Sequence, residues 1–237
     1  MSIFVLKIIA MISMVIDHSR YLHPIFDNDI TKVIGRFSFI LFAFILTEGI
    51  WHTKDRTKYL KRIVLFAVVS QIPFMIFRSI VGRYIILNIL FTFAIGMILI
   101  ILIDKQKNEY IKLLIAIVGI VFSILVPIDY GVYGIVLIII MYYTRKTRLF
   151  DLGFFIINMI YYGNKVVETT YDCKQLVPYM IGTYLTYIFL KLYNGKLGKK
   201  VKFLYLFYPI HLVILFLIYC IWNNINLITL GWKWLRI

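Results

Sequence analysis

Charge is scarce in this chain, and acidic charge is scarcest. Charged residues make up 16% of the 237 residues, and only 11 of them are Asp or Glu. Ordinary globular domains contain roughly 25% charged and about 45–50% apolar residues. With 62% hydrophobic residues and a mean hydropathy of +0.90, the chain falls outside that class. The composition excludes an ordinary soluble domain and indicates an integral membrane protein.

Cysteine is almost absent. The two cysteines, Cys173 and Cys220, form no CxxC or Cys/His spacing, so we expect neither a structural zinc site nor any other metal site. If both lie on the outer side of the membrane, a disulfide between them is permitted. The first apolar segment lacks a small-residue cleavage site, so we interpret it as a helix rather than a signal peptide. No soluble or low-complexity segment interrupts residues 1–237, which we interpret as a single membrane domain.

The apolar runs are long and continuous. A transmembrane barrel would show short alternating strands, whereas a backbone in lipid otherwise bonds within its own helix. The predicted fold class is therefore all-α, a polytopic bundle of about nine transmembrane helices. The segments between 111 and 163 are short for a span of about 20 residues, so the count is open there. We expect the spans at 3–20, 34–52, 62–78, 85–103, 111–127, 131–144, 149–163, 176–193 and 203–222.

Lys and Arg are unevenly distributed between the connections. The formal charge of +15 could suggest a nucleic-acid partner, but the cations lie in short loops, so we expect none. Even-numbered connections carry about twice as many Lys and Arg as odd-numbered ones and the C-terminal tail. The even-numbered loops and the N-terminus are therefore predicted to be cytoplasmic. We interpret Trp232 and Trp234, beyond the ninth span, as anchors at the membrane surface.

Polar residues inside several spans converge on one level. A charged side chain in hydrocarbon costs roughly 2.5–3.5 kcal/mol or more, so it persists where it faces a partner, a protein interior or water. Given the predicted orientation, four spans bring polar residues to the outer half of the membrane. These are Asp17, His18, Arg36, Gln71, Asn88 and Thr92.

The adjacent Asp17 and His18 cannot face one another on a helix. We therefore predict that Asp17 pairs with Arg36 and leaves His18 free for proton transfer. The alternative is a structural ion pair with His18 in contact with water. Near the inner side, Glu48 and His211 are expected at similar depth, where they could line a passage from the cytoplasm.

Several short motifs together resemble the TraX family. The resemblance covers both ends of the chain and is strongest in the first hundred residues. Its motifs are Gly35-Arg36-Phe37-Ser38-Phe39, Thr47-Glu48-Gly49, Ser70-Gln71-Ile72-Pro73-Phe74, Asn88-Ile89-Leu90-Phe91-Thr92 and Tyr208-Pro209-Ile210-His211-Leu212.

The resemblance implies an acyltransferase. TraX proteins are associated with N-terminal acetylation of pilin. They are similar to transmembrane acyltransferases that carry an acyl group from cytoplasmic acyl-coenzyme A, here acetyl-CoA, to an extracytoplasmic acceptor. In those relatives an intramembrane His is central, and His18 is the best match. The acceptor, a peptide, protein or glycan, does not follow from the resemblance.

The residues fit that chemistry. A neutral His can take the proton of an attacking amine or hydroxyl. Arg36, Gln71 or Asn88 could stabilise the tetrahedral oxyanion. The predicted catalytic residues are His18, Asp17 and Arg36. The residues predicted to bind substrate are Gln71, Asn88, Thr92, Glu48 and His211. The coenzyme phosphates are expected at Lys58, Lys61 and Arg62 in a cytoplasmic loop.

Two other classes remain open. A transporter also places polar residues on interrupted helices, although no inverted repeat is visible. A membrane peptidase or a structural subunit agrees less well with the sequence, which contains none of the peptidase motifs HExxH, GxSxG or paired catalytic aspartates. We expect a multi-pass protein of the cell membrane, that is, of a bacterial plasma membrane.

Overall fold

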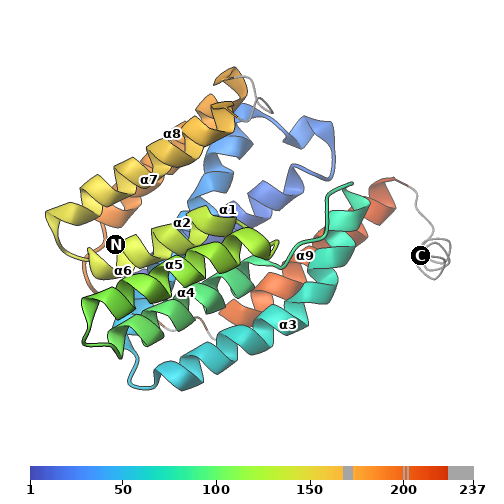
Figure 1. Cartoon of the computed structure of the whole chain (residues 1–237). Helices are drawn as coiled ribbons and strands as arrows, with labels where there is room; N and C mark the ends of the chain where they lie inside the picture. The colour runs from blue at the N-terminus through green and yellow to red at the C-terminus, as the bar shows by residue number, and fades with distance from the viewer. Residues whose placement is uncertain (168–172, 200, 202, 224–237) are drawn as a thin grey trace.

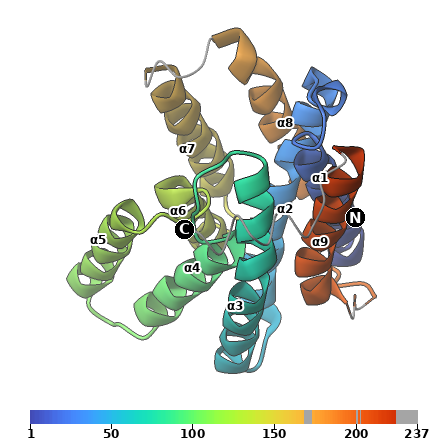
Figure 2. The ribbon, with the colours of Figure 1, turned by 90° about the vertical axis from the view of Figure 1, so that its right-hand side faces the viewer.

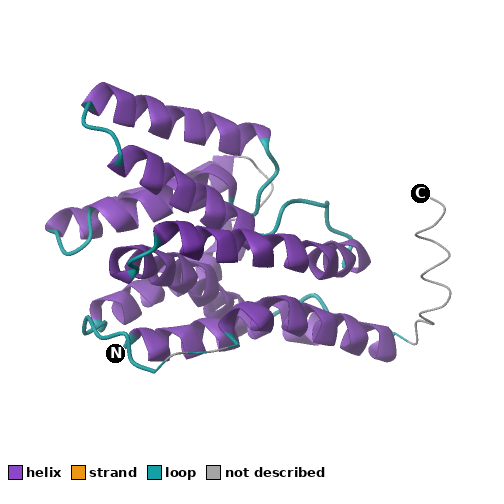
Figure 3. Ribbon diagram, turned by 90° about the horizontal axis from the view of Figure 1, so that it is seen from below, coloured by secondary structure: helices purple, strands orange, loops and turns teal. Residues whose placement is uncertain are grey.

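Helices account for the folded chain. The computed structural model describes residues 1–167, 173–199, 201 and 203–223. Figure 3 shows helices and loops and no strand in these ranges. The helices are α1 (Ile3–Ser19), η1 (Pro24–Phe26), α2 (Asp29–His52), α3 (Arg56–Ile80), α4 (Ile89–Asp104), α5 (Glu109–Leu125), α6 (Gly131–Tyr143), α7 (Arg148–Val167), α8 (Cys173–Lys191) and α9 (Leu204–Trp222).

Side-chain caps decide where several of these helices begin. Asn28 and Thr31 form a reciprocal capping box, so α2 begins before the predicted residue 34. Asp55 accepts a hydrogen bond from the Lys58 amide, so α3 begins before residue 62. Asn88 caps α4 and delays its start beyond residue 85. Hydropathy alone marks apolar stretches and misses these polar caps.

Helix α2 lies at the centre of the bundle. It packs against α1, α4, α6 and α8 (Figure 2), and most of its apolar side chains are buried. Two glycines let the neighbouring helices approach it closely. A Cβ added at Gly35 would lie 2.9 Å from Cγ of Asp17 on α1, and one at Gly182 on α8 would lie 2.9 Å from Cβ of Arg36. Small residues of this kind are typical of close helix packing in membranes.

The outward faces of the peripheral helices are apolar. Leu65, Val68 and Ile72 on α3, and Leu113 and Ile117 on α5, are exposed. Figure 1 shows α3 and α9 extending beside each other along one side of the bundle. Helices α2, α3 and α9 are long and apolar enough to cross a membrane, and α4 and α6 are shorter apolar helices. The predicted all-helical membrane fold is confirmed, while the number of spans and the side of the N-terminus stay predictions.

Two expectations concern the ends of α8 and α9. Cys220 is a buried free thiol, so the suggested disulfide is not formed in this structure. The side chain of its partner, Cys173, lies outside the described residues. The suggested anchors Trp232 and Trp234 lie outside them as well.

Candidate active site

A cavity of about 330 Å³ opens at the predicted outer level of the bundle. Residues of α1, α2, α3, α4, α7, α8 and α9 line it, together with the connection before α6. Helix α2 begins seven residues before Arg36, so this part of the cavity lies about 10 Å below the end of the helix at ~1.5 Å per residue. Its charged and histidine lining consists of Asp17, His18, Arg20, Arg36, Arg78, Arg83, Asp129 and Lys165.

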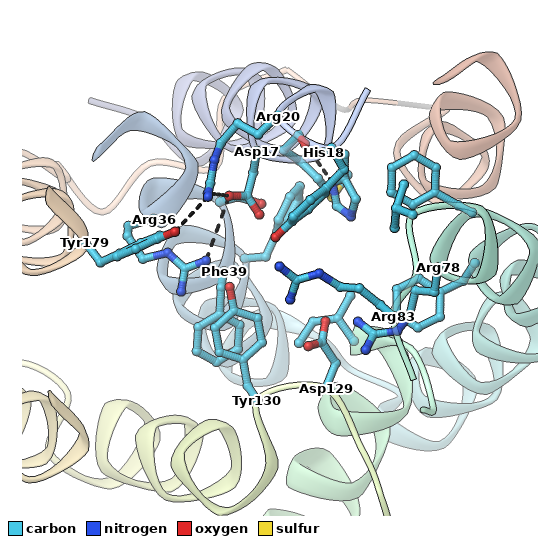
Figure 4. A pocket seen from close by; sticks show the side chains of 18 of the residues that line it. Asp17, His18, Arg20, Arg36, Phe39, Arg78, Arg83, Asp129, Tyr130 and Tyr179 are labelled. Atoms are coloured by element: carbon cyan, nitrogen blue, oxygen red, sulfur yellow. Dashed lines mark hydrogen bonds and ion pairs between the residues drawn. The ribbon is translucent and has the colours of Figure 1, made fainter. Parts of the chain in front are cut away.

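Asp17 holds two arginines on one side of this cavity. Its Oδ1 lies 2.9 Å from Nη1 of Arg20 and 3.9 Å from Nη2 of Arg36. Arg20 also donates to Asp27 at 3.0 Å and to the Tyr179 hydroxyl at 2.7 Å, as the dashed lines of Figure 4 show in part. The predicted pair between Asp17 and Arg36 is confirmed. Arg20 was not among the predicted site residues, although an acid and an arginine three residues apart share a helix face.

The charge of Arg20 is secured by these neighbours. Asp17, Asp27 and the Tyr179 hydroxyl all accept hydrogen bonds from its guanidinium group. Arg36 contacts aromatic rings as well: its guanidinium carbon lies 5.5 Å from the ring centre of Tyr130 and 5.3 Å from that of Tyr179. Its Nε is buried and has no hydrogen-bond partner in the described part of the chain. Arg36 is therefore a cavity residue with unused donor capacity.

His18 is oriented by its own helix. Its Nδ1 lies 2.8 Å from the Met14 carbonyl oxygen, and because a carbonyl only accepts, Nδ1 carries the proton. The lone pair of the neutral ring is therefore on Nε2, which hydrogen-bonds to no other described residue. As predicted, Asp17 does not orient this ring. The ring packs edge-on against Phe77, with 5.6 Å between centroids.

His211 lies beside His18, at a centroid distance of 5.1 Å. Its Nδ1 is 3.0 Å from the Phe207 carbonyl, while Nε2 is buried with no hydrogen-bond partner among the described residues. The prediction that His211 lies at the depth of Glu48 is therefore wrong. Tyr205, at the start of α9, stacks on Phe66, which lies ten residues and about 15 Å beyond the first residue of α3. Helix α9 therefore begins deep inside the bundle, and His211 lies farther from the predicted cytoplasmic end than expected.

Three other predicted site residues lie behind the cavity wall. Gln71 donates to the Ile86 carbonyl at 2.9 Å and accepts from Asn88, while Asn88 also donates to the Ala67 carbonyl at 2.7 Å. Thr92 donates to the Asp129 carbonyl at 2.5 Å. None of the three lines the cavity. Their polar groups hold loops against α3 and α4, so the prediction that they face substrate is corrected to a structural role.

The cavity also contains groups that the sequence analysis did not select. Arg78, Arg83, Asp129 and Tyr130 were not among the polar residues predicted to converge at this level. Figure 4 shows the Asp17–Arg36 side and the Arg78–Arg83 side on opposite sides of the cavity. Burial is the largest effect on the pKa of Asp129 and raises it, although Arg78 acts in the opposite sense. The sequence offers one indication of their role: these residues flank spans whose outer ends are predicted to lie at the same level.

Glu48 lies at the opposite end of the bundle, which is predicted to be cytoplasmic, and away from this cavity. It is 1% exposed and forms ion-pair hydrogen bonds to Arg145, one of them at 2.8 Å from Nη2. The Tyr193 hydroxyl donates to it at 2.8 Å. The hydrogen bond to Glu48 is the first cause of the raised pKa of Arg145. With its oxygens bonded in this way, Glu48 connects α2 to the α6–α7 loop and does not join the outer site.

A second cavity, of about 640 Å³, lies at the end of the bundle that is predicted to be cytoplasmic. Lys58 and Arg62 line it, together with Lys7 and His52. Lys58 and Arg62 are four residues apart and therefore share one face of α3. Lys61 lies off that face and does not line the cavity. The prediction for the coenzyme phosphates thus retains two of its three cations.

A third, apolar cavity of about 70 Å³ lies between these two. It shares Phe42, Phe93 and Tyr208 with the outer cavity, and Tyr59 and Tyr205 with the cytoplasmic one. The three cavities therefore form a row between Arg62 and His18. Among the described residues, no group of three or more His, Cys, Asp or Glu could hold a metal ion.

The fold and the cavities define the chain as a helical membrane protein with a histidine in a basic cavity. The chain belongs to the TraX family: residues 2–219 match the family described as "TraX protein". It is also 27% identical over 231 residues to the "Probable fimbrial assembly protein FimC, serogroup H1" of Dichelobacter nodosus, covering 90% of this chain and 94% of that protein. No solved structure matches the chain.

Proposed function

We propose that the protein is a membrane-embedded acyltransferase. It takes an acyl group, which we expect to be acetyl, from acyl-coenzyme A on the cytoplasmic side and gives it to an amine or hydroxyl on the outer side. The observation that carries this proposal is the row of three cavities with shared walls, from Lys58 and Arg62 at one end to His18 at the other.

The cytoplasmic cavity suits the charged part of the donor. Lys58 and Arg62 give charge-assisted hydrogen bonds to phosphate oxygens, and Leu197 and Leu204 form an apolar wall. The uncharged thioester arm of the donor would extend through the middle cavity. Lys7 and His18 lie eleven residues apart on α1, so the arm must bridge about 16 Å to reach the histidine.

The outer cavity supplies the acid–base chemistry. Nε2 of His18 takes the proton of the acceptor as its nitrogen or oxygen attacks the thioester carbonyl carbon. The tetrahedral oxyanion that forms collapses and the carbon–sulfur bond breaks. The departing thiolate takes the proton back from His18, which yields acylated acceptor and free coenzyme. Of the three groups predicted to stabilise the oxyanion, Arg36 lines the cavity and has a buried Nε without a partner.

The family and the relative suggest where the acceptor lies. The Dichelobacter nodosus protein is described as a probable fimbrial assembly protein. This supports an acceptor that reaches the outer face of a bacterial plasma membrane, such as the N-terminus of a fibre subunit. The apolar exposed faces of α3 and α5 support the lipid bilayer as the first partner of the chain.

A transporter of small anions is the second candidate. The same row of cavities with basic ends favours it. The two functions differ in one measurable respect, because a transporter moves its substrate and leaves the thioester intact.

The decisive experiment uses purified protein in vesicles with labelled acetyl-coenzyme A and an amine acceptor. His18→Gln should lower acyl transfer about 10²–10⁴-fold, as removal of a general base does. Its melting temperature and its affinity for coenzyme A should stay the same. His23→Gln is the matched control, because His23 lies in the outer loop and does not line the cavity. Full transfer by a folded His18→Gln protein would contradict the mechanism and pass the role to His211.

A further inference from the structure

The outer cavity is strongly basic. Four arginines and one lysine line it, against two carboxylates. One of these carboxylates, Asp17, forms ion pairs with Arg20 and Arg36. The cations on the opposite side, Arg78 and Arg83, have no carboxylate within ion-pair distance in the described part of the chain.

The loop after α3 holds these two arginines in place. Nε of Arg78 donates to the Tyr84 carbonyl at 2.6 Å, and the Arg83 amide donates to the Arg78 carbonyl at 2.8 Å. Gly82 permits the turn between them with φ +68°. The Arg83 guanidinium carbon lies 4.5 Å from the ring centre of Tyr21, which also lines the cavity. Among the described residues, no hydrogen bond or ion pair involves the terminal nitrogens of either arginine, so these nitrogens are available to a ligand.

His18 and these arginines line the same cavity. Phe77, which touches the His18 ring, directly precedes Arg78 in the chain. A molecule whose nucleophile reaches His18 therefore places its neighbouring atoms beside Arg78 and Arg83. Guanidinium groups bind carboxylates and phosphates through two parallel hydrogen bonds. A neutral or cationic molecule would leave positive charge on this wall unmatched, because the one carboxylate there, Asp129, offsets at most one of the two arginines.

We infer that the acceptor carries an anionic group, a carboxylate or a phosphate, close to its nucleophilic amine or hydroxyl, and that Arg78 and Arg83 bind this group. This inference rests on the proposed function and specifies its substrate class. Asp129 lies on the same wall and has no ion pair with a described residue, so the cavity retains an excess of positive charge when Asp129 is ionised.

Three primary amines with the same two-carbon spacing test the inference. Phosphoethanolamine carries a phosphate, β-alanine a carboxylate and ethanolamine neither. Binding of each to the full-length protein is measured by calorimetry, and acyl transfer to each from labelled acetyl-coenzyme A is measured in phosphatidylcholine vesicles. A parallel vesicle containing phosphatidylethanolamine separates a lipid headgroup from a soluble acceptor of the same chemistry.

We expect at least one anionic amine to bind and react tenfold or more better than ethanolamine. The double variant Arg78→Gln with Arg83→Gln should remove this advantage, so that the anionic amines react no better than ethanolamine. Arg148→Gln, an exposed arginine at the start of α7, is the matched control and should have no effect.

Two outcomes separate this inference from the proposed function. Equal transfer to all three amines would overturn the inference while the acyltransferase proposal stands. Arginine-dependent binding of phosphoethanolamine or β-alanine without transfer to any amine would establish the anion site and defeat the acyltransferase proposal.

Discussion

Replacing Asp17 with Asn should destabilise the protein rather than remove a chemical group from the reaction. The Asp17 side chain is 16% exposed and is the shared partner of Arg20 and Arg36, whose side chains are 4% and 18% exposed. The amide removes the charge with little change of shape. Arg20 keeps Asp27, but Arg36 loses the carboxylate that lies nearest to it.

The size of the effect follows from this burial. Breaking a buried ion pair by removing one partner costs about 3–5 kcal/mol, and the cavity beside Asp17 favours the lower value because water screens part of the charge. A loss of about 3 kcal/mol changes the folding equilibrium on the order of 100-fold. For a chain of this size it lowers the melting temperature by about 6–12 °C.

The buried thiol of Cys220 provides the assay. With Cys173 replaced by Ser, Cys220 is the sole cysteine, and a thiol-reactive dye reports its exposure as the protein unfolds in detergent. His18→Gln, one residue away, should melt like the parent protein. Arg36→Gln combined with Asp17→Asn should recover part of the loss, because Arg36 is the charge that Asp17→Asn leaves unpaired. A parental melting temperature for Asp17→Asn would refute the reasoning.

Three further predictions concern the ends of the bundle. Replacing Lys58 and Arg62 with Gln should raise the apparent constant for acyl-coenzyme A tenfold or more with little change in turnover, whereas Lys61→Gln should change neither value. In intact cells a single cysteine at Asp27 should react with an impermeant reagent and one at Lys58 should not; labelling at Lys58 would reverse the orientation. Because burial raises the pKa of Asp129 above its unfolded value, this group contributes full stability at low pH and loses it as pH rises through the raised pKa. Asp129→Asn should therefore remove part of the fall in melting temperature with rising pH, and an identical slope in both proteins would exclude this role.

Much of the fold follows from hydropathy and charge. Each predicted span overlaps one observed helix, because long apolar runs permit few other structures in lipid. Helix ends were harder to predict, since polar caps such as Asn28 and Asn88 lie outside the apolar windows. The depth of His211 was misjudged because depth was counted from the start of its own span. The offset of α9 along α3 arises from tertiary packing, which hydropathy and the order of the spans do not reveal.

The candidate site was predicted in part. Polarity within a span identified Asp17, His18 and Arg36 correctly as cavity residues. The same criterion selected Gln71 and Asn88, whose side chains hydrogen-bond to loops, because a span residue that caps a helix and one that binds a ligand look alike in sequence. Arg78 and Arg83 were overlooked, because a loop arginine normally signals topology and only the folded chain turns these two toward the cavity.

The apolar middle cavity has a consequence for the membrane itself. Its lining includes Met14, Phe42, Ile45 and Leu46, so a hydrated ion would shed its water there without gaining a replacement. A membrane potential acts on each elementary charge with about 2.3 kcal/mol per 100 mV, and a row of wet cavities across the bilayer would dissipate it. On the proposed function, this apolar segment admits the uncharged thioester arm and opposes the passage of ions, which counts against the alternative of an anion transporter. An acyltransferase built in this way would keep the membrane electrically insulating with no moving gate.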